Sequence, residues 1–139
     1  MEILTERLIL REFLFNDWPA VLAYQQDHRY LEFHPFFTRI GSGTKEIVQW
    51  CLDEQTELPR NQVQLAVVLK ETNEVIGNAG VHRKPENDWE ADLDFEIAPE
   101  YWKQGYATEA TVALIEYGFN EMKLHRISPS CIAENRASA

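Results

Sequence analysis

The segment of residues 99–110 combines the residue types that can bind an anion through the main chain. It follows a short alternating run, residues 91–97, and opens an amphipathic helical pattern that continues to about Met122. The first N–H groups of a helix have no intrahelical partner, and the helix dipole places partial positive charge there. Gly105 allows close approach to the backbone, and the small Ala107 leaves room beside it. The pattern favours a phosphate-bearing cofactor held by backbone amides, although a loop that caps an ordinary buried helix would have the same pattern.

Three acids alternate along the run that precedes this loop. In residues 91–97, Asp92, Asp94 and Glu96 are expected on one face of a strand, and apolar residues on the other. Such carboxylates can attract a cationic amine and accept a proton from it. A solvated sheet face without a chemical role explains the same alternation, so both interpretations stay open.

The elements that must hold these residues follow from hydrophobic periodicity and turn residues. The expected strands, in chain order, cover residues 5–13, 62–69, 75–81, 91–97 and 124–132. The polar turns between the middle strands are expected at residues 71–74 and 84–88. One helix is expected to start at Asp17, and a second at Thr44, after a flexible turn at residues 41–43. With the long helix after Gly105, this order predicts a mixed α/β fold in a single domain, residues 1–139.

The composition excludes several classes of protein. With 139 residues, of which 45% are hydrophobic and 26% charged, the chain is long enough for one globular core. A formal net charge of −10 argues against binding to nucleic-acid phosphates, and no apolar run is long enough to span a membrane. The N-terminus has no signal-peptide pattern, and Cys51 and Cys131 lack metal-ligand spacing. These features predict a cytoplasmic protein with reduced cysteines, no metal, and no membrane or nucleic-acid partner.

Residues 99–110 resemble the acetyl-CoA pyrophosphate loop of the GNAT superfamily of N-acyltransferases, Q/R-x-x-G-x-G/A. Trp102, Gly105 and Ala107 stand at its three defined positions. A Trp there, followed by G-Y-A-T-E-A, is typical of the branch that contains ribosomal-protein N-terminal acetyltransferases and polyamine acetyltransferases. Further segments that resemble this branch, in the same order, are residues 5–11, Asp17, residues 75–77, 124–127 and 134–138. One departure is Lys103, which replaces the Gly usual after that Trp.

The resemblance implies acetyl-CoA as co-substrate and a set of residues that hold it. The main-chain groups implied to contact the pyrophosphate belong to Lys103, Gln104, Gly105, Tyr106, Ala107 and Thr108. The backbone of Phe95, Glu96 and Ile97 is implied to bind the pantetheine arm and to polarise the thioester. Asn135 resembles the family Asn that forms a hydrogen bond to the same arm.

The chemistry implied is direct transfer of an acetyl group to a primary amine of a small molecule or of a protein N-terminus. Asp92, Asp94 and Glu96 are the candidates for the base that deprotonates the amine, and Asp92 stands where many relatives carry Glu. Ser138 is the candidate acid for the leaving thiolate, because relatives use a residue after the Asn turn for that step.

The C-terminal part of the resemblance leads to an alternative. GNAT domains continue beyond the N-R-A-S sequence through a helix and a β-hairpin, so the expected fold is GNAT-like without these last elements. Pro129 also lies inside an expected strand, where proline is normally confined to edges or bulges. The alternative is a catalytically inactive CoA-binding or structural domain, completed by a partner chain. An open strand edge predicts self-association as a homodimer through residues 126–132.

Overall fold

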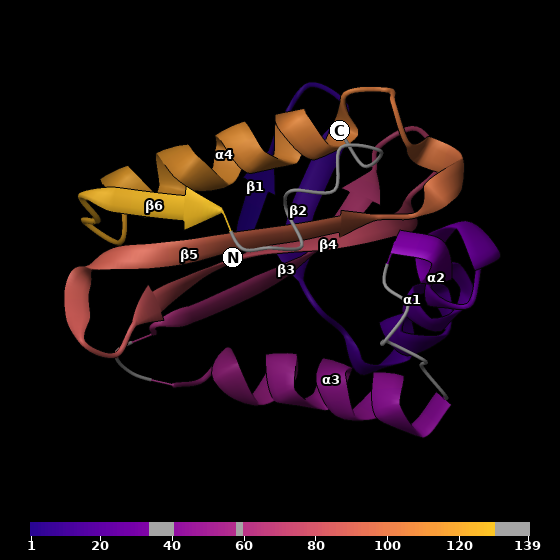
Figure 1. The fold of residues 1–139 in the computed structure, drawn as a ribbon, viewed down its shortest axis with the longest axis horizontal. Helices are drawn as coiled ribbons and strands as arrows, with labels where there is room; N and C mark the ends of the chain where they lie inside the picture. Colours follow the sequence, from indigo (N-terminus) through magenta and orange to yellow (C-terminus); the bar gives the residue numbers. More distant parts are fainter. Residues whose placement is uncertain (34–40, 58–59, 130–139) are drawn as a thin grey trace.

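A six-stranded sheet organises the part of the chain that the computed structural model describes, residues 1–33, 41–57 and 60–129 (Figure 1). The strands lie side by side in chain order: β1 (Glu2–Leu4), β2 (Leu8–Glu12), β3 (Gln62–Leu69), β4 (Glu74–Lys84), β5 (Asn87–Ile97) and β6 (Arg126–Pro129). Neighbours from β1 to β5 pair antiparallel, whereas β5 and β6 pair parallel. Parallel pairing needs a crossover connection, which the helix between β5 and β6 provides. The expected mixed α/β fold is confirmed.

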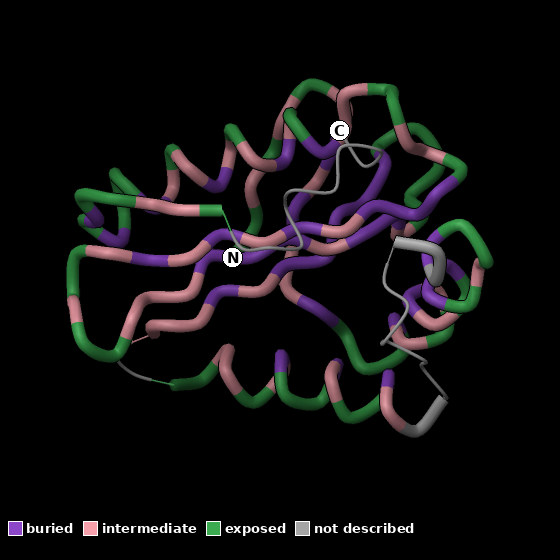
Figure 2. The backbone as a smooth tube through the Cα atoms, viewed as in Figure 1, coloured by how far each residue is buried: buried purple, intermediate pink, exposed green. Residues whose placement is uncertain are grey.

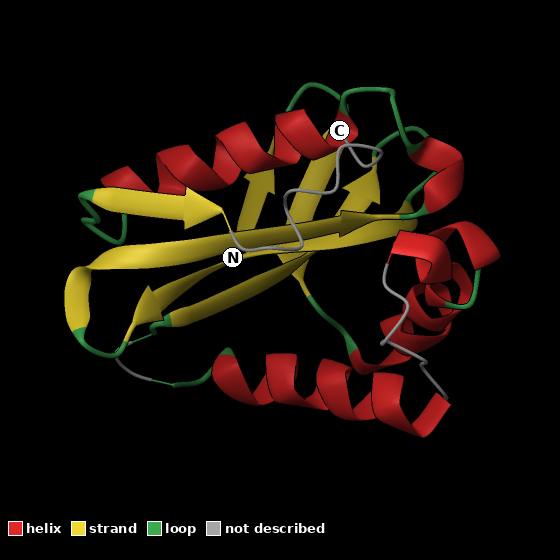
Figure 3. Cartoon of the chain, viewed as in Figure 1, coloured by secondary structure: helices red, strands yellow, loops and turns green. Residues whose placement is uncertain are grey.

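Helices cover both faces of this sheet (Figures 1 and 3). One face carries α1 (Trp18–Gln25), α2 (His28–Phe33) and α3 (Gly41–Glu54), and the other carries α4 (Tyr106–Asn120). Two single-turn helices, η1 (Phe15–Asp17) and η2 (Pro99–Tyr101), come before α1 and α4 respectively. The α4 helix is the crossover from β5 to β6.

Alternation along the strands divides their side chains between two hydrophobic cores. Under α4, the side chain of Leu114 packs with strand residues that include Leu65 and Leu93. Under α1 and α3, Val48 packs with strand residues that include Val68. Figure 2 shows the buried positions following the central strands. Because successive strand residues face opposite sides, the polar residues that alternate with the α4-side core point toward α1 and α3.

The middle of the sheet matches the expected strands, with longer pairing between two of them. The strand expected at residues 62–69 is β3 itself. β4 and β5 both extend beyond the expected ranges because pairing continues to Lys84 and Asn87. The turn expected at residues 84–88 is therefore wrong in its bounds, and only residues 85–86 separate the two strands.

The first expected strand, residues 5–13, is wrong in its bounds: β2 covers only Leu8–Glu12, and the sequence did not predict β1 before it. The chain turns at Thr5, whose backbone N–H donates to the Leu8 carbonyl at 2.9 Å, and this turn separates β1 from β2. At the other end of the chain, β6 ends at Pro129 in the described residues, and the expected continuation over residues 130–132 lies outside them.

One expected helix start differs from that observed, and the other holds without the expected side-chain cap. The α3 helix already begins at Gly41, so the flexible turn at residues 41–43 and the cap at Thr44 are wrong. Thr44 is instead buried within α3, where its hydroxyl donates to the Gln25 amide oxygen at 3.4 Å. Asp17 does stand at the N-cap position of α1, but its carboxylate accepts from the Leu14 backbone at 2.7 Å and caps no α1 N–H.

Candidate active site

The loop between β5 and α4 has the backbone geometry that main-chain anion binding requires. Gly105 occupies the N-cap position of α4 with φ +83°, and Lys103 has φ +63°, so the chain turns through two left-handed residues. Within the described part of the chain, no side chain caps this helix end, and its first N–H groups keep no side-chain acceptor. The indole N–H of Trp102 anchors the loop by donating to the Ile97 carbonyl at 2.7 Å.

Arg7 holds this loop against the start of β2. Its Nε donates to Oε1 of Glu109 at 2.7 Å, and its Nη1 donates to the Gln104 carbonyl at 2.9 Å. Its guanidinium also lies 4.3 Å from the centroid of the Tyr106 ring. The second oxygen of Glu109 accepts from the Arg7 backbone at 2.8 Å and from the Thr5 hydroxyl. We call this set of contacts the Arg7 clamp.

The Arg7 clamp joins two charged groups that stand 102 positions apart in the sequence. Burial alone would raise the pKa of Glu109, but hydrogen bonds from Thr5 and Arg7 outweigh burial and lower that pKa below its usual value. The hydrogen bond to Glu109 raises the pKa of Arg7. Both groups are therefore charged at neutral pH, and the clamp fixes the Gln104 carbonyl beside the start of α4.

The acids of β5 share one face of the sheet, but their surroundings differ. The side chain of Asp92 is 50% exposed, and Nζ of Lys84 lies 3.8 Å from its Oδ1. The side chain of Asp94 is 34% exposed, with Nε2 of His82 at 3.4 Å from its Oδ2. The amide of Gln64 donates to the other oxygen of Asp94 at 3.3 Å. Gln64 and His82 therefore orient the Asp94 carboxylate, although neither of the two contacts is a short hydrogen bond.

Glu96 is bound from several sides. Its Oε2 accepts from the amides of Gln25 at 2.8 Å and Asn78 at 3.0 Å, and its Oε1 accepts from the Tyr30 hydroxyl at 3.1 Å. The Asn78 amide also donates to the Tyr24 hydroxyl at 2.7 Å. Burial, together with the charge of Glu96, raises the pKa of Tyr24 well above its usual value. The Glu96 carboxylate therefore joins α1 and α2 to the sheet.

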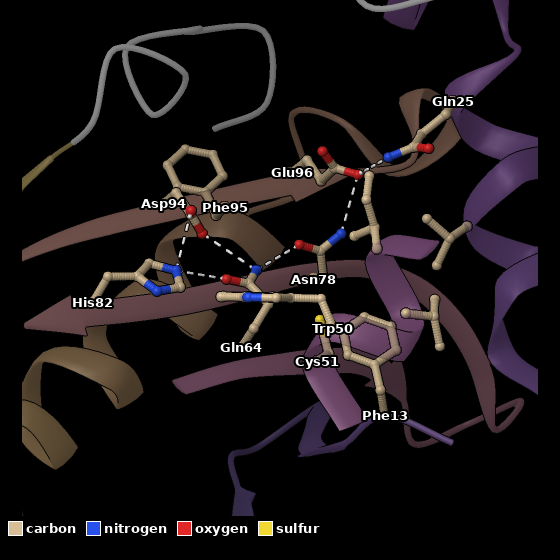
Figure 4. A pocket seen from close by; sticks show the side chains of 13 residues that line it. Phe13, Gln25, Trp50, Cys51, Gln64, Asn78, His82, Asp94, Phe95 and Glu96 are labelled. Carbon is tan, nitrogen blue, oxygen red and sulfur yellow. Dashed lines mark hydrogen bonds and ion pairs between the residues drawn. The ribbon is translucent and has the colours of Figure 1, made fainter. Parts of the chain in front are cut away.

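A cavity of about 350 Å³ lies between these strands and the helices on the same face (Figure 4). The sheet supplies its polar wall, made of Gln64, Asn78, His82, Asp94 and Glu96. The apolar wall comes mainly from α1 and α3 and includes Phe13, Val21, Ile47, Val48, Trp50 and Cys51. Burial raises the pKa of the Cys51 thiol to about 12, so this thiol stays protonated and behaves as a small apolar group.

Cross-strand register explains how the polar wall is held in place. Gln64, Gly80 and Asp94 lie in one row across β3, β4 and β5. A Cβ at Gly80 would lie 2.1 Å from the amide oxygen of Gln64, so the missing side chain lets Gln64 lie across β4 to reach Asp94. The same amide oxygen lies 2.7 Å from Nε2 of His82, whose ring centroid is 6.2 Å from that of Trp50. Figure 4 shows His82, Gln64 and Asp94 converging at one end of the cavity.

Comparison with known proteins assigns the chain to a family. The family model of the acetyltransferase (GNAT) domain matches residues 7–139. The chain belongs to the GNAT acetyltransferase family. It is 34% identical over 135 residues to the uncharacterized N-acetyltransferase YnaD of Bacillus subtilis, and the match covers 97% of this chain and 75% of YnaD.

Solved structures of GNAT proteins have the same fold. A GNAT-family acetyltransferase from Bacillus anthracis is 32% identical with a TM-score of 0.81, over 99% of this chain and 78% of that one. RimL, a ribosomal L7/L12 alpha-N-protein acetyltransferase solved in complex with coenzyme A, gives a TM-score of 0.79 at 19% identity, over 99% of this chain and 78% of RimL. At that identity the likeness to RimL concerns the fold alone. The expected enzyme class, an N-acetyltransferase, is confirmed by the family model and by the likeness to YnaD and to the Bacillus anthracis acetyltransferase.

The site residues predicted from the sequence of this GNAT domain lie in three places. Residues 103–108 form the end of the loop and the start of α4. On β5, Phe95 and Glu96 both line the cavity, and Phe95 and Ile97 also belong to the core under α4. Asn135 and Ser138 lie outside the described residues.

Two polar-wall residues of this GNAT domain, Gln64 and Asn78, have no role predicted from the sequence, whereas His82 follows an expected strand from which it could line the cleft. A signal for them is present, because each is a polar residue on the same face of an otherwise apolar strand. The pattern along each strand does not place this face in the site. The register between β4 and β5 does so, because it sets Asn78 opposite Glu96.

No group of three or more His, Cys, Asp or Glu in residues 1–33, 41–57 and 60–129 could hold a metal ion. None of the helices in these ranges is both long and apolar enough to cross a membrane. Cys51 is a free, buried thiol.

Proposed function

We propose that this protein transfers the acetyl group of acetyl-CoA directly to a primary amine of a small molecule or of a protein N-terminus. One observation carries the proposal: the uncapped start of α4 and the carboxylate-lined cavity are both built on β5. The end of β5 leads into the loop, and its face presents Asp94 and Glu96 to the cavity. Family membership supplies the reaction class, and the coenzyme A bound by RimL supports acetyl-CoA as the donor.

The loop fits the pyrophosphate of such a donor. Free N–H groups and the helix dipole both favour an anion at a helix N-terminus. The main-chain groups to which we assign this role are those of Lys103, Gln104, Gly105, Tyr106, Ala107 and Thr108. The backbone of Phe95, Glu96 and Ile97, with the side chain of Asn135, would hold the pantetheine arm. Acetyl-CoA supplies the activated thioester when bound.

The acceptor amine must lose a proton before its nitrogen can attack. The pKa of an alkylammonium is about 10.4, so deprotonation at pH 7 costs about 4–5 kcal/mol. Of the candidates Asp92, Asp94 and Glu96, we favour Asp94 as base, because it lines the cavity and its contacts, at 3.3 and 3.4 Å, are longer than those of Glu96. Asp94 would take the proton while the N–C bond forms and the C–S bond breaks. Ser138 would protonate the leaving thiolate.

Replacement of Gly105 by Val tests the assignment of the loop. Valine is strained at φ +83°, and a Cβ there would lie 3.3 Å from Nη2 of Arg7. We expect Gly105→Val to lose coenzyme A binding in calorimetry and amine-dependent thiol release from acetyl-CoA, while unfolding in urea stays cooperative. Gly43→Val is the matched control, because a Cβ at Gly43 meets nothing within 4 Å. Unchanged coenzyme A affinity in Gly105→Val would contradict the assignment.

We further propose that the chain self-associates as a homodimer through residues 126–132. In the described part of the chain, β6 has β5 as its one strand neighbour. A free strand edge pairs readily with another chain. The alternative is that the chain is a coenzyme A-binding or structural domain without catalytic activity. In that case the same association would complete its fold.

A further inference from the structure

The cavity between the sheet and the α1 and α3 helices restricts the kind of amine that it can take. We propose that the acceptor is a primary monoamine with an apolar body, and that Asp94 binds its ammonium group. This inference rests on the proposed function, because it names the acceptor of that reaction. Under this proposal diamines and polyamines are poor acceptors, because they carry further positive charges along their chains.

Glu96 is already occupied by donors from the protein. An ionised carboxylate offers about four acceptor sites, and three of those on Glu96 receive hydrogen bonds from Gln25, Asn78 and Tyr30. An ammonium group brings three N–H donors of its own. It would have to displace contacts that tie α1, α2 and β4 to β5, so Glu96 acts here as a structural carboxylate.

Asp94 has room for the ammonium group. Within the described residues, its contacts are with Gln64 at 3.3 Å and His82 at 3.4 Å. Gln64 is itself fixed by the Asn78 amide oxygen, to which it donates at 2.7 Å. The Asp94 carboxylate is therefore oriented but not saturated, and it is 34% exposed at the polar wall. An ammonium group placed there forms charge-assisted hydrogen bonds, which are stronger than neutral ones.

Among the described residues, the opposite wall has no carboxylate for a second cation. The side chains of Val21, Ile47 and Val48 are apolar, and the raised pKa of Cys51, about 12, keeps its thiol uncharged. A volume of about 350 Å³ is at the lower end for ligand sites but encloses a six-carbon chain. The far end of an enclosed diamine would therefore place an unpaired charge against apolar groups, which is strongly disfavoured.

Two amines of equal length test the proposal without turnover. Binding of hexylamine and of hexamethylenediamine to the full chain is measured by calorimetry at neutral pH, where both are charged. We expect hexylamine to bind with one-to-one stoichiometry and hexamethylenediamine to bind at least about tenfold more weakly. Asp94→Asn should weaken hexylamine binding by at least about tenfold. The matched control is Asp88→Asn, on the exposed end of β5 and away from the cavity, and it should leave binding unchanged.

Three results would overturn the proposal: no hexylamine binding, equal or tighter binding of the diamine, or wild-type affinity in Asp94→Asn. The comparison of the two amines uses the wild-type chain, so it stands even if the variant fails to fold. Thiol release from acetyl-CoA with the same amines is recorded separately. Selective hexylamine binding without any acetyl transfer would refute the proposed function alone, whereas acetylation that favours the diamine would refute this inference alone.

Discussion

Lys103 adopts a backbone conformation that favours glycine. Its φ of +63° lies in the left-handed region, which costs a residue with a Cβ roughly 1–2 kcal/mol. The GNAT loops that this segment resembles usually have Gly at the same position. The geometry supplies the reason, because the chain must pass through two left-handed residues, Lys103 and Gly105, before α4 can start.

At the residue scale we therefore predict that Lys103→Gly stabilises the protein. Relief of the left-handed conformation exceeds the added entropy of the unfolded chain, for a net gain of about 0.5–1 kcal/mol. Urea unfolding measures the change. Gln104→Gly is the control, because Gln104 has no positive φ and its replacement should only destabilise. A loss of stability in Lys103→Gly would mean that the Lys103 side chain contributes more than its backbone costs.

The carboxylates of β5 illustrate what the sequence predicts for a single residue and what it does not. Alternation correctly places Asp92, Asp94 and Glu96 on one face. Their different surroundings come from β4, which sets His82 opposite Asp92 and Asn78 opposite Glu96, and from β3, α1 and α2, which supply Gln64, Gln25 and Tyr30. A pattern along one strand predicts which face a carboxylate occupies, but its contacts depend on a neighbouring strand whose register the pattern does not contain.

At the scale of elements, the Arg7 clamp connects the start of β2 to the start of α4. It places the partly buried carboxylate of Glu109 on the first turn of α4, where negative charge is favourable. It also holds the Gln104 carbonyl, and so the loop that we assign to the pyrophosphate. The stability of this loop therefore depends on the protonation of Glu109.

We predict that Glu109→Gln destabilises the protein by about 1–2 kcal/mol at neutral pH. Because hydrogen bonds lower the pKa of Glu109 in the folded state, its contribution is complete above the ordinary value of 4.5 and is lost as pH falls through the lower, folded value. The difference from wild type should therefore shrink below pH 4.5 in urea unfolding. Glu116→Gln, on the exposed side of α4, should show no such pH-dependent difference. A gap that stays constant with pH would exclude the clamp as its cause.

The elements themselves were predictable where local pattern and pairing agree. The apolar run of β3 is bounded by polar residues at both ends, and its limits follow from the sequence. The start of α3 does not, because residues 41–43 contain two glycines, which disfavour a helix by local propensity, and yet they are helical. The division of β1 from β2 depends on the turn at Thr5, and hydrophobic alternation does not predict this turn.

At the scale of the whole molecule, we predict self-association of this chain. The β6 strand forms one edge of the described sheet, and its Pro129 has no N–H to donate to a further strand. Residues 126–128 retain theirs, so a two-fold contact at this edge is expected. Sedimentation velocity at tens of micromolar should show a dimer. A clean monomer with no binding of an apolar dye would contradict the prediction.

The order of strands in the sheet has a consequence for how the site can diverge in evolution. Because strand order follows chain order, the polar wall is encoded by one contiguous meander, β3 to β5, while the Arg7 clamp is assembled from residues 5–7 and 104–109. Mutations that drift within the meander can therefore alter acceptor preference while the donor loop keeps its sequence. The loop to which we assign the donor and the wall to which we assign the acceptor are then free to change separately, joined only where β5 passes into the loop before α4.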